Sequence, residues 1–381
     1  MIFKRVLDLA GLLKHKSILL LGPRQTGKST LCQETLSAAY TVNLMESDAF
    51  REYSANPELL RERLPAECQV LVVDEAQRVP ELFNEVQVLL DRNPRLRVVL
   101  TGSSARKFKR GHINLLPGRV WQRTLHPLVW PEIPVELRGE RLIRGSLPAI
   151  IQSEMFREEL RNYVGLYLEQ EIKAEALVRS IGNFSRFLNV VALSNGEVIN
   201  YSKIAQDAEV KLNTVRNYFQ ILSDTLVGHI LEPYRKTPSR KAVASSKFYL
   251  FDLGVTNQLL NRYELVPGTS AYGRALEHMI LLEIKAYIDY VGLSLPVFFW
   301  RTHSRLEVDF IVGDSVAIEV KSTDKIKYAD LKGMKALSDD MKLKRKIIVC
   351  REKVRRVMDG GIEIVPVDEF LEELWAGVLF R

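Results

Sequence analysis

The sequence predicts an α/β protein built from three parts. Its N-terminal part alternates apolar runs with helix-compatible stretches, which is the pattern of a mostly parallel sheet with helices on both faces. A helix-rich middle part follows, and the C-terminal part returns to strands flanked by helices. A chain of 381 residues also exceeds what one hydrophobic core normally holds. We therefore expect domains at residues 1–150, 151–255 and 256–381.

Five strands are expected in the first domain, with helices between them. The run at 70–74 is continuously apolar until it reaches an acidic residue, as in a central parallel strand that is buried on both faces. A Pro-rich segment at 128–134 and a Gly-Ser-Leu-Pro break at 145–148 mark the end of the domain. The strands are expected at 17–22, 40–44, 70–74, 98–101 and 119–125, and two of the helices at 29–36 and 57–64.

The most specific motif follows the first strand directly. It reads Gly22-Pro23-Arg24-Gln25-Thr26-Gly27-Lys28-Ser29-Thr30, and its G-x-x-x-x-G-K-S spacing is that of a phosphate-binding loop. The glycines let the backbone turn its N–H groups toward an anion. The start of the following helix adds its positive dipole end. We expect Lys28 to reach the outer phosphates of a nucleoside triphosphate and the Ser29 hydroxyl to bind Mg²⁺.

Polar residues at the ends of two further strands extend this site. Asp74 and Glu75 end the strand at 70–74, at the edge where parallel sheets bind ligands. Asp74 is expected to hold Mg²⁺ through water, and Glu75 to polarise the attacking water. Ser103, in Thr101-Gly102-Ser103-Ser104, could sense the γ-phosphate or position that water. The alternatives are an ordinary strand with an acidic loop and a plain turn.

The composition points to a soluble globular protein. Hydrophobic residues make up 46% of the chain and charged residues 27%. No run of 18 apolar residues suggests a membrane span, and the N-terminus lacks the pattern of a signal peptide. The 3 cysteines show neither metal nor disulfide spacing. We therefore expect a cytoplasmic protein that does not bind membranes.

The positive charge is concentrated in one segment. The net charge is +7, and residues 321–356 contain 13 Lys and Arg against 5 Asp and Glu. A basic patch of this kind suggests nucleic acid or another polyanion as a partner. Solvated helix faces have the same composition, so both interpretations remain open.

The middle domain contains a helix-turn-helix pattern. Residues 201–210 and 214–222 read as two short helices with a tight turn between them, with Thr214 at or near the second N-cap. In DNA-binding proteins the second helix enters the major groove, and here it offers Arg216 and Asn217. Such domains also dock proteins, so both partners remain open. The other elements expected here are a helix at 156–176 and the wing strands of a winged-helix domain at 226–231 and 247–251.

A β-hairpin is expected in the C-terminal domain. Residues 305–312 and 315–321 are strands joined by a Gly-Asp turn, which is a strong hairpin signal. An amphipathic helix at 273–284 and a strand at 296–300 precede it.

The hairpin carries an acidic pattern. Asp309 is followed by Glu319-x-Lys321, and Glu319 and Lys321 share one face of the strand. Two such carboxylates can hold a divalent cation, and the lysine can orient water or stabilise developing charge. Glu277 on the preceding helix could supply a third carboxylate for this second metal site. A plain hairpin with polar residues on its outer face is the alternative.

Over nearly its whole length the chain resembles prokaryotic AAA-type (AAA+) ATPases that carry a C-terminal domain of unknown function with a restriction-endonuclease-like, PD-(D/E)XK core. The resemblance implies Mg²⁺-dependent ATP binding and hydrolysis, with the loop and the two strand-end carboxylates in the roles given above. Arg119 resembles the arginine that acts as a finger or sensor, in its own subunit or in a neighbour. The segments that carry the resemblance, besides the phosphate loop and the helix-turn-helix, are Leu71-Val72-Val73-Asp74-Glu75-Ala76-Gln77, Leu100-Thr101-Gly102-Ser103-Ser104, Leu116-Pro117-Gly118-Arg119, Arg144-Gly145-Ser146-Leu147-Pro148, Phe248-Tyr249-Leu250-Phe251-Asp252-Leu253-Gly254 and Glu307-Val308-Asp309-Phe310 with Glu319-Val320-Lys321.

Three functions follow from this organisation. The first is an ATP-driven motor or switch on DNA, assembled as a ring with a hexamer favoured, since ATPase followed by winged helix is similar to the architecture of Holliday-junction branch-migration motors. The second is an ATP-regulated nuclease, in defence or repair, in which Asp309, Glu319 and Lys321 are catalytic. The third is an ATP-gated signalling switch that binds another protein.

Overall fold

The protein divides into two compact units in its computed structural model. The structure describes residues 1–103, 116, 118–168, 180–237 and 242–380. One unit is formed by Met1–Leu128 with Asp224–Val227, and the other by Val129–Ser223 with Gly228–Arg381. This differs from the three-part division at 150 and 255 that we expected, because the middle and C-terminal parts share one sheet.

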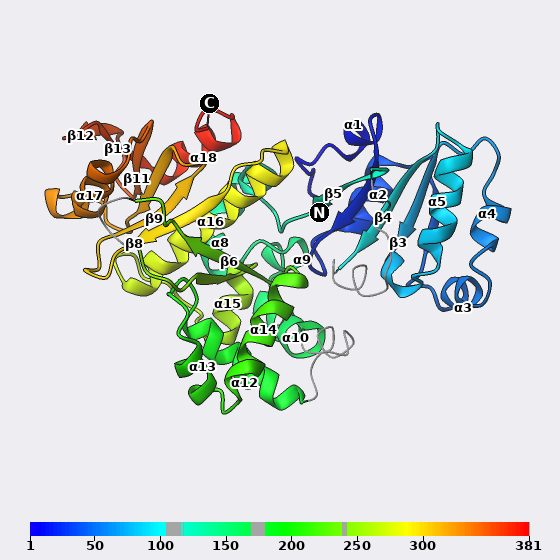
Figure 1. Cartoon of the computed structure of the whole chain (residues 1–381), viewed down its shortest axis with the longest axis horizontal. Coiled ribbons are helices and arrows are strands. Elements are labelled where there is room, and N and C mark those ends of the chain that lie inside the picture. The colour runs from blue at the N-terminus through cyan, green and yellow to red at the C-terminus, as the bar shows by residue number, and fades with distance from the viewer. Residues whose placement is uncertain (104–115, 117, 169–179, 238–241, 381) are drawn as a thin grey trace. The chain divides into compact units, whose positions relative to one another are not determined.

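The first unit contains a five-stranded, fully parallel sheet in the order β2-β3-β4-β1-β5 (Figure 1). β1 is buried along its whole length, as expected for a strand with helices on both faces. Placing β4 between β1 and β3 brings the ends of all three strands together at one edge. The strands are β1 (Ser17–Leu21), β2 (Tyr40–Asn43), β3 (Val70–Asp74), β4 (Arg97–Gly102) and β5 (Val120–Thr124).

Helices complete the first unit and fill its core. Helix α5 is strongly amphipathic and buries Phe83 and Val86 with the strand residues Leu71 and Val98. The expected helices at 29–36 and 57–64 are present with slightly different bounds. The helices are α1 (Leu9–Leu13), α2 (Lys28–Thr35), α3 (Ser47–Ala55), α4 (Leu59–Arg63) and α5 (Leu82–Arg92), with the 3-10 turn η1 (Ala76–Arg78) after β3.

The second unit is built on an eight-stranded mixed sheet in the order β12-β13-β11-β10-β9-β8-β6-β7. The expected hairpin is the antiparallel pair β9–β10. The expected wing strands are β6 and β7, but β6 also pairs with β8, in parallel, at Glu232–Phe298 and Pro233–Phe299. The wing is therefore an edge of the C-terminal sheet. The strands are β6 (Gly228–Pro233), β7 (Lys247–Leu250), β8 (Val297–Arg301), β9 (Glu307–Val312), β10 (Val316–Val320), β11 (Arg345–Cys350), β12 (Arg356–Met358) and β13 (Ile362–Pro366).

Helices cover both faces of this sheet. On one face α16 and α18 pack on alternate strand residues such as Ile347 and Val349, and on the other α17 packs on Ile348 and Cys350. In Figure 1 the long helix α16 runs across the sheet. The helices are α7 (Val135–Arg138), α8 (Arg141–Arg144), α9 (Pro148–Ile151), α10 (Phe156–Asn162), α12 (Ile181–Leu193), α13 (Tyr201–Asp207), α14 (Leu212–Asp224), α15 (Leu253–Leu259), α16 (Ser270–Val291), α17 (Lys332–Asp340) and α18 (Val367–Trp375), with the short turns η2 (Trp130–Glu132), η3 (Tyr163–Leu168) and η4 (Tyr328–Leu331).

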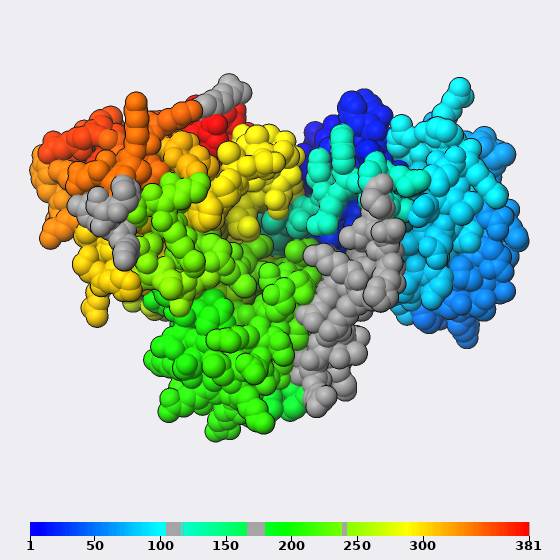
Figure 2. Space-filling view, viewed as in Figure 1, coloured from blue at the N-terminus to red at the C-terminus, as the bar shows by residue number. Residues whose placement is uncertain are grey.

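Helices α12–α14 form a lobe held by aromatic side chains, seen in green in Figure 2. The rings of Phe184 and Tyr218 lie 5.0 Å apart, and Phe219 lies 5.0 Å from Phe248 on β7. The helix-turn-helix is thereby fixed to the edge of the sheet. Helix α14 begins at Leu212, so Thr214 lies inside the helix rather than at its N-cap. The helix expected at 156–176 is described only in part, because residues 169–179 lie outside the described ranges.

Two buried carboxylates anchor the beginning of the second unit. Glu283 on α16 accepts hydrogen bonds from Trp130 N (3.0 Å) and Trp375 Nε1 (2.7 Å) and also pairs with Arg141. Asp252 accepts a hydrogen bond of 2.7 Å from Ser146 N. This bond joins the Gly-Ser-Leu-Pro segment to the later Asp-Leu-Gly segment. Among the described helices none is both long and apolar enough to cross a membrane.

Candidate functional site

The phosphate-loop motif forms a tight turn at the carboxyl end of β1. Gly27 begins α2 with φ of 91°, a left-handed conformation that favours glycine. Gly22 lies so close to β5 that an added Cβ would be 2.4 Å from the Leu125 carbonyl oxygen. Both glycines are therefore required by the backbone path. The turn leads directly into the N-terminus of α2, the position where the motif predicts an anion to bind.

Lys28 lies along the inside of the loop. Its ammonium donates to the carbonyl oxygens of Gly22 (2.8 Å) and Pro23 (3.1 Å), and the side chain is buried. These bonds hold the ammonium group inside the loop. Oxygen atoms of a bound phosphate would replace the two carbonyl oxygens as its hydrogen-bond acceptors. Arg5, which precedes the loop in the sequence, also stabilises it, because its Nη1 donates a hydrogen bond of 2.6 Å to Thr26 O.

Ser29 and Asp74 meet at the edge of the sheet. The Ser29 hydroxyl donates a hydrogen bond of 2.6 Å to Asp74 Oδ2, and the other carboxylate oxygen accepts one from Thr101. Hydroxyl and carboxylate oxygens are the ligands that Mg²⁺ prefers. The residues present therefore fit the cation that the motif implies.

Glu75 is held in an uncommon conformation beside Asp74. Its φ is 57°, and its backbone N–H donates to the Thr101 hydroxyl at 3.0 Å. Its carboxylate accepts a bond of 2.5 Å from Gln77 Nε2, and the same amide nitrogen lies 3.4 Å from Ser103 Oγ. Gln77 thus joins Glu75 to the expected γ-phosphate sensor. Sequence reasoning quoted Gln77 only as part of a motif and did not assign it a role.

Arg119 is not placed beside the loop of its own chain. Arg119 directly precedes β5. The first residue of β5, Val120, is aligned with Ser17 at the start of β1, so Arg119 lies at the edge of the sheet opposite to the phosphate loop. Its Nη2 lies 2.6 Å from Asp91 Oδ1, in a partly exposed ion pair. The neighbouring residues Ser104 and Pro117 lie outside the described residues.

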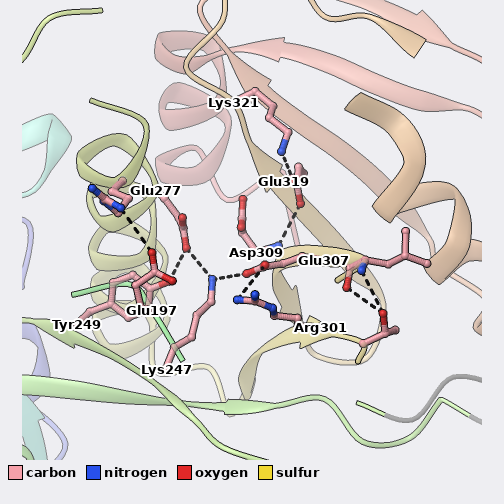
Figure 3. Close-up of polar contacts among 12 residues, drawn as sticks. Glu197, Lys247, Tyr249, Glu277, Arg301, Glu307, Asp309, Glu319 and Lys321 are labelled. Atoms are coloured by element: carbon pink, nitrogen blue, oxygen red, sulfur yellow. Dashed lines mark hydrogen bonds and ion pairs between the residues drawn. The ribbon is translucent and has the colours of Figure 1, made fainter. Parts of the chain in front are cut away.

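The C-terminal acidic residues do converge. Glu277, Asp309, Glu319 and Lys321 all line one cleft of about 580 Å³ (Figure 3). Lys321 Nζ lies 2.5 Å from Glu319 Oε1. Asp309 Oδ2 accepts a bond of 2.8 Å from Val320 N.

Burial and mutual repulsion perturb these carboxyl groups. Burial raises the pKa of Asp309 well above its usual range, and the nearby charges of Glu277 and Glu319 add to this effect. Burial also raises the pKa of Glu319, although the Lys321 ammonium opposes the shift. This acidic pattern is therefore a buried, strongly coupled cluster, and the plain hairpin with an outer polar face does not describe it.

A residue that sequence reasoning did not assign to the site lies within the cluster. Lys247, at the start of β7, pairs with Glu277 Oε1 at 3.0 Å and with Glu307 Oε1 at 2.7 Å. Burial lowers the pKa of Lys247, but the surrounding carboxylates outweigh this and raise it well above its usual value. In the sequence, Lys247 was only the first residue of the expected strand at 247–251.

The expected second metal site is not assembled. Within the described part of the chain, no group of three or more His, Cys, Asp or Glu side chains is placed to hold a metal ion. Glu277 is instead paired with Lys247, Glu319 is paired with Lys321, and Asp309 Oδ2 accepts a hydrogen bond from Val320 N.

Several arginines of the basic segment are paired with acidic residues within the segment or just after it. Arg345 and Arg355 both pair with Glu363 and Glu373. Arg356 pairs with Glu352 at 2.7 Å. The excess of positive charge at 321–356 is thus partly an internal ion-pair network, which favours the solvated-face interpretation for those residues.

Family comparisons divide the chain into three consecutive segments. Residues 14–134 match an AAA domain, residues 136–265 a domain of unknown function, DUF8612, and residues 272–370 another, DUF4143. The matched AAA domain coincides with the parallel-sheet unit and its phosphate loop. This match supports an AAA-type ATPase.

Two relatives match most of the chain. Two uncharacterized proteins, from Mycobacterium bovis and Mycobacterium tuberculosis, are each 25% identical over 364 residues, covering 93% of this chain and 80% of the relative. Two solved structures are much more distant. A signal transduction ATPase with numerous domains and a tetratricopeptide repeat sensor, from Pyrococcus horikoshii, is 13% identical with a TM-score of 0.23, over 76% of this chain and about half (48%) of that one. Drosophila ORC bound to GC-rich DNA and Cdc6 is 10% identical with a TM-score of 0.22, over 66% of this chain and 87% of that one. TM-scores this low give no support for a shared fold.

Proposed function

We propose that the protein is a Mg²⁺-dependent ATPase whose turnover is coupled to DNA. The observation that carries the ATPase part is the contact of Ser29 with Asp74 at 2.6 Å beside a phosphate-loop lysine. A hydroxyl, a carboxylate and an ammonium of this kind, next to a helix N-terminus, suit a nucleoside triphosphate with its cation.

Each residue of this site has its own role in the proposed reaction. Backbone amides of the loop after Pro23, up to Thr30, would hold the phosphates, and Lys28 would leave the loop carbonyls to neutralise the outer phosphate oxygens. Ser29 and Asp74 would hold Mg²⁺, which neutralises charge on the phosphates when bound. Glu75, oriented by Gln77, would accept a proton from the attacking water, while Ser103 lies against the same amide nitrogen.

Nucleotide binding is tested by calorimetry. ATP with Mg²⁺ should bind the full chain, and Lys28→Ala should weaken the affinity by about 10- to 100-fold, as expected for loss of a charge-assisted contact. Lys4→Ala, which removes an exposed ammonium outside the motif, serves as the matched control. Absence of heat of binding for the parental protein would remove the basis of the proposal.

DNA is proposed as the effector because basic side chains border the C-terminal cleft and the second helix of the helix-turn-helix. Arg274, Arg301 and Arg305 line the cleft, and Arg216 on α14 lies 5.8 Å from the ring of Tyr201. DNA, including branched forms such as Holliday junctions, should stimulate ATP turnover, with a response that falls steeply as salt rises. A turnover rate that no DNA form changes at low salt would argue instead for a protein-binding switch.

Ring assembly would give Arg119 a role. An arginine at the far edge of the sheet cannot reach the loop of its own chain, but a neighbouring subunit could present it to the next site. Native mass measurement with ATP should then show an oligomer, and mixing Arg119→Ala subunits with Glu75→Gln subunits should restore turnover at mixed interfaces. A monomer that hydrolyses ATP at the same specific rate at all concentrations would exclude this role.

A further inference from the structure

A lysine ammonium takes the cation position of the C-terminal cleft. Lys247 Nζ lies between Glu277 and Glu307, at 3.0 and 2.7 Å from their nearest oxygens, and its side chain is 3% exposed (Figure 3). Asp309 and Glu319 line the same cleft. We propose that Lys247 is a built-in cation that replaces a divalent metal ion among these carboxylates.

The edge strand β7 explains why the ammonium is so firmly held. Side chains alternate along a strand, so Lys247 and Tyr249 point to the same side. Tyr249 Oη donates a bond of 2.5 Å to Glu277 Oε1, the oxygen that Lys247 also contacts. The ammonium also lies 5.4 Å from the centre of the Phe299 ring, a favourable cation–π distance.

The distances suit an ammonium and not a metal ion. Values of 2.7–3.0 Å are those of charge-assisted N–H···O bonds. Mg²⁺ needs oxygen ligands at about 2.0–2.1 Å, so each carboxylate oxygen would have to move inward by roughly 0.6–0.9 Å with the ammonium displaced. Tyr249 and the helix position of Glu277 oppose this movement. The cleft therefore keeps the Asp309…Glu319-x-Lys321 order, while the neighbouring Glu277 and Glu307 oxygens are spaced around an ammonium group.

The charge balance gives the same conclusion. Buried carboxylates without a counter-ion are strongly unfavourable, so a protein that lacks the metal must supply a positive group itself. Lys321 pairs with Glu319 at 2.5 Å, Lys247 lies between Glu277 and Glu307, and Arg301 also pairs with Glu307 at 3.6 Å. Loss of the Lys247 ammonium should leave a vacancy that attracts a divalent cation.

Titration of the nucleotide-free full chain with MnCl₂, followed by the electron paramagnetic resonance signal of free Mn²⁺, tests this proposal. The parental protein should show no Mn²⁺ binding that depends on Asp309. Lys247→Met keeps the apolar stem without the charge, and it should gain a Mn²⁺ site at least about tenfold tighter than any in the parent. The added substitution Asp309→Asn should abolish the gained site. Lys332→Met, which removes another lysine lining the cleft, should not create one.

Two results would overturn the proposal. Parental Mn²⁺ binding that disappears in Asp309→Asn would show that a metal and Lys247 coexist, and this comparison decides even if Lys247→Met fails to fold. A folded Lys247→Met or Lys247→Gln protein, judged by circular dichroism, that gains no Mn²⁺ site would show that the ammonium does not hold the cation position. Because no nucleotide is present, neither result depends on the ATPase proposal.

Discussion

The Ser29 hydroxyl donates a hydrogen bond of 2.6 Å to Asp74 Oδ2, although the two residues are 45 positions apart in the chain. A Mg²⁺ ion that the hydroxyl binds directly and that the carboxylate holds through a coordinated water would lie beside this contact. The 2.6 Å spacing therefore brings the two groups to one place before the cation binds. The alignment of β1 with β4, and of β4 with β3, fixes this spacing.

Asp74→Asn should raise the Mg²⁺ concentration needed for ATP turnover. The amide keeps the size of the carboxylate but loses its negative charge, so we expect the concentration for half-maximal turnover to rise about tenfold or more. A magnesium titration at saturating ATP measures this. Asp91→Asn, which removes the exposed partner of Arg119, is the control and should leave the magnesium requirement unchanged, because Asp91 lies outside the proposed magnesium site. Equal requirements in both variants would contradict the assignment of Asp74.

Glu75→Gln should retain ATP binding and slow hydrolysis. The phosphate contacts remain, but the amide cannot accept a proton from water, so turnover should fall by about 10²- to 10⁴-fold. Nucleotide affinity by calorimetry and single-turnover hydrolysis separate the two effects. Hydrolysis at the parental rate would assign water activation to another residue.

Gln77→Ala should lower the rate constant of turnover by about tenfold, because one orienting hydrogen bond of about 1.5 kcal/mol to Glu75 is lost. KM for ATP should not change, since Gln77 contacts the carboxylate and not the loop in the described residues. A purely structural role would instead lower the melting temperature and raise KM as well. Gln77→Ala combined with Glu75→Gln should cost no more than Glu75→Gln alone, because the two residues act as a unit.

The residues of the proposed nucleotide site could be recognised in the sequence because their signals are local. The phosphate loop is contiguous, and Asp74 and Glu75 directly follow a run of four apolar residues. What sequence did not provide is strand order. With β4 between β1 and β3, Thr101 contacts both Asp74 and Glu75, and Arg119 lies at the opposite edge.

The second unit was harder to predict because its decisive contacts are long-range. The pairing of β6 with β8 joins segments about 65 residues apart and converts the expected wing into a sheet edge. At the same edge, Lys247 on β7 pairs with Glu307, which is 60 positions away in the sequence. Periodicity identifies each strand by itself but contains no information on such partners.

His278 should make the second unit less stable as the pH falls. Burial lowers its pKa from 6.5 to about 4. Its Nε2 donates to Leu250 O at 2.5 Å, and its Nδ1 lies 3.2 Å from Asn195 Nδ2. Asn195 Oδ1 accepts from Leu250 N at 2.8 Å, which directs the amide N–H₂ toward the ring. Nδ1 must therefore accept that bond and stay unprotonated.

The sign of the pH effect follows from this depressed pKa. Above pH 6.5 the ring is neutral in both states and its full contribution is present. Below pH 6.5 the unfolded chain takes up the proton first, so stability falls until the pH approaches about 4, by at most about 3 kcal/mol. His278→Gln can still donate to Leu250 O but cannot titrate, so it should lack this decrease. Denaturant unfolding at several pH values between 7 and 4 measures the difference between the two proteins. Asp309 and Glu319, whose raised pKa values act in the opposite direction, are present in both and cancel in that difference. Parallel stability curves for the two proteins would show that the pKa of His278 is the same in the folded and the unfolded state, which would contradict this prediction.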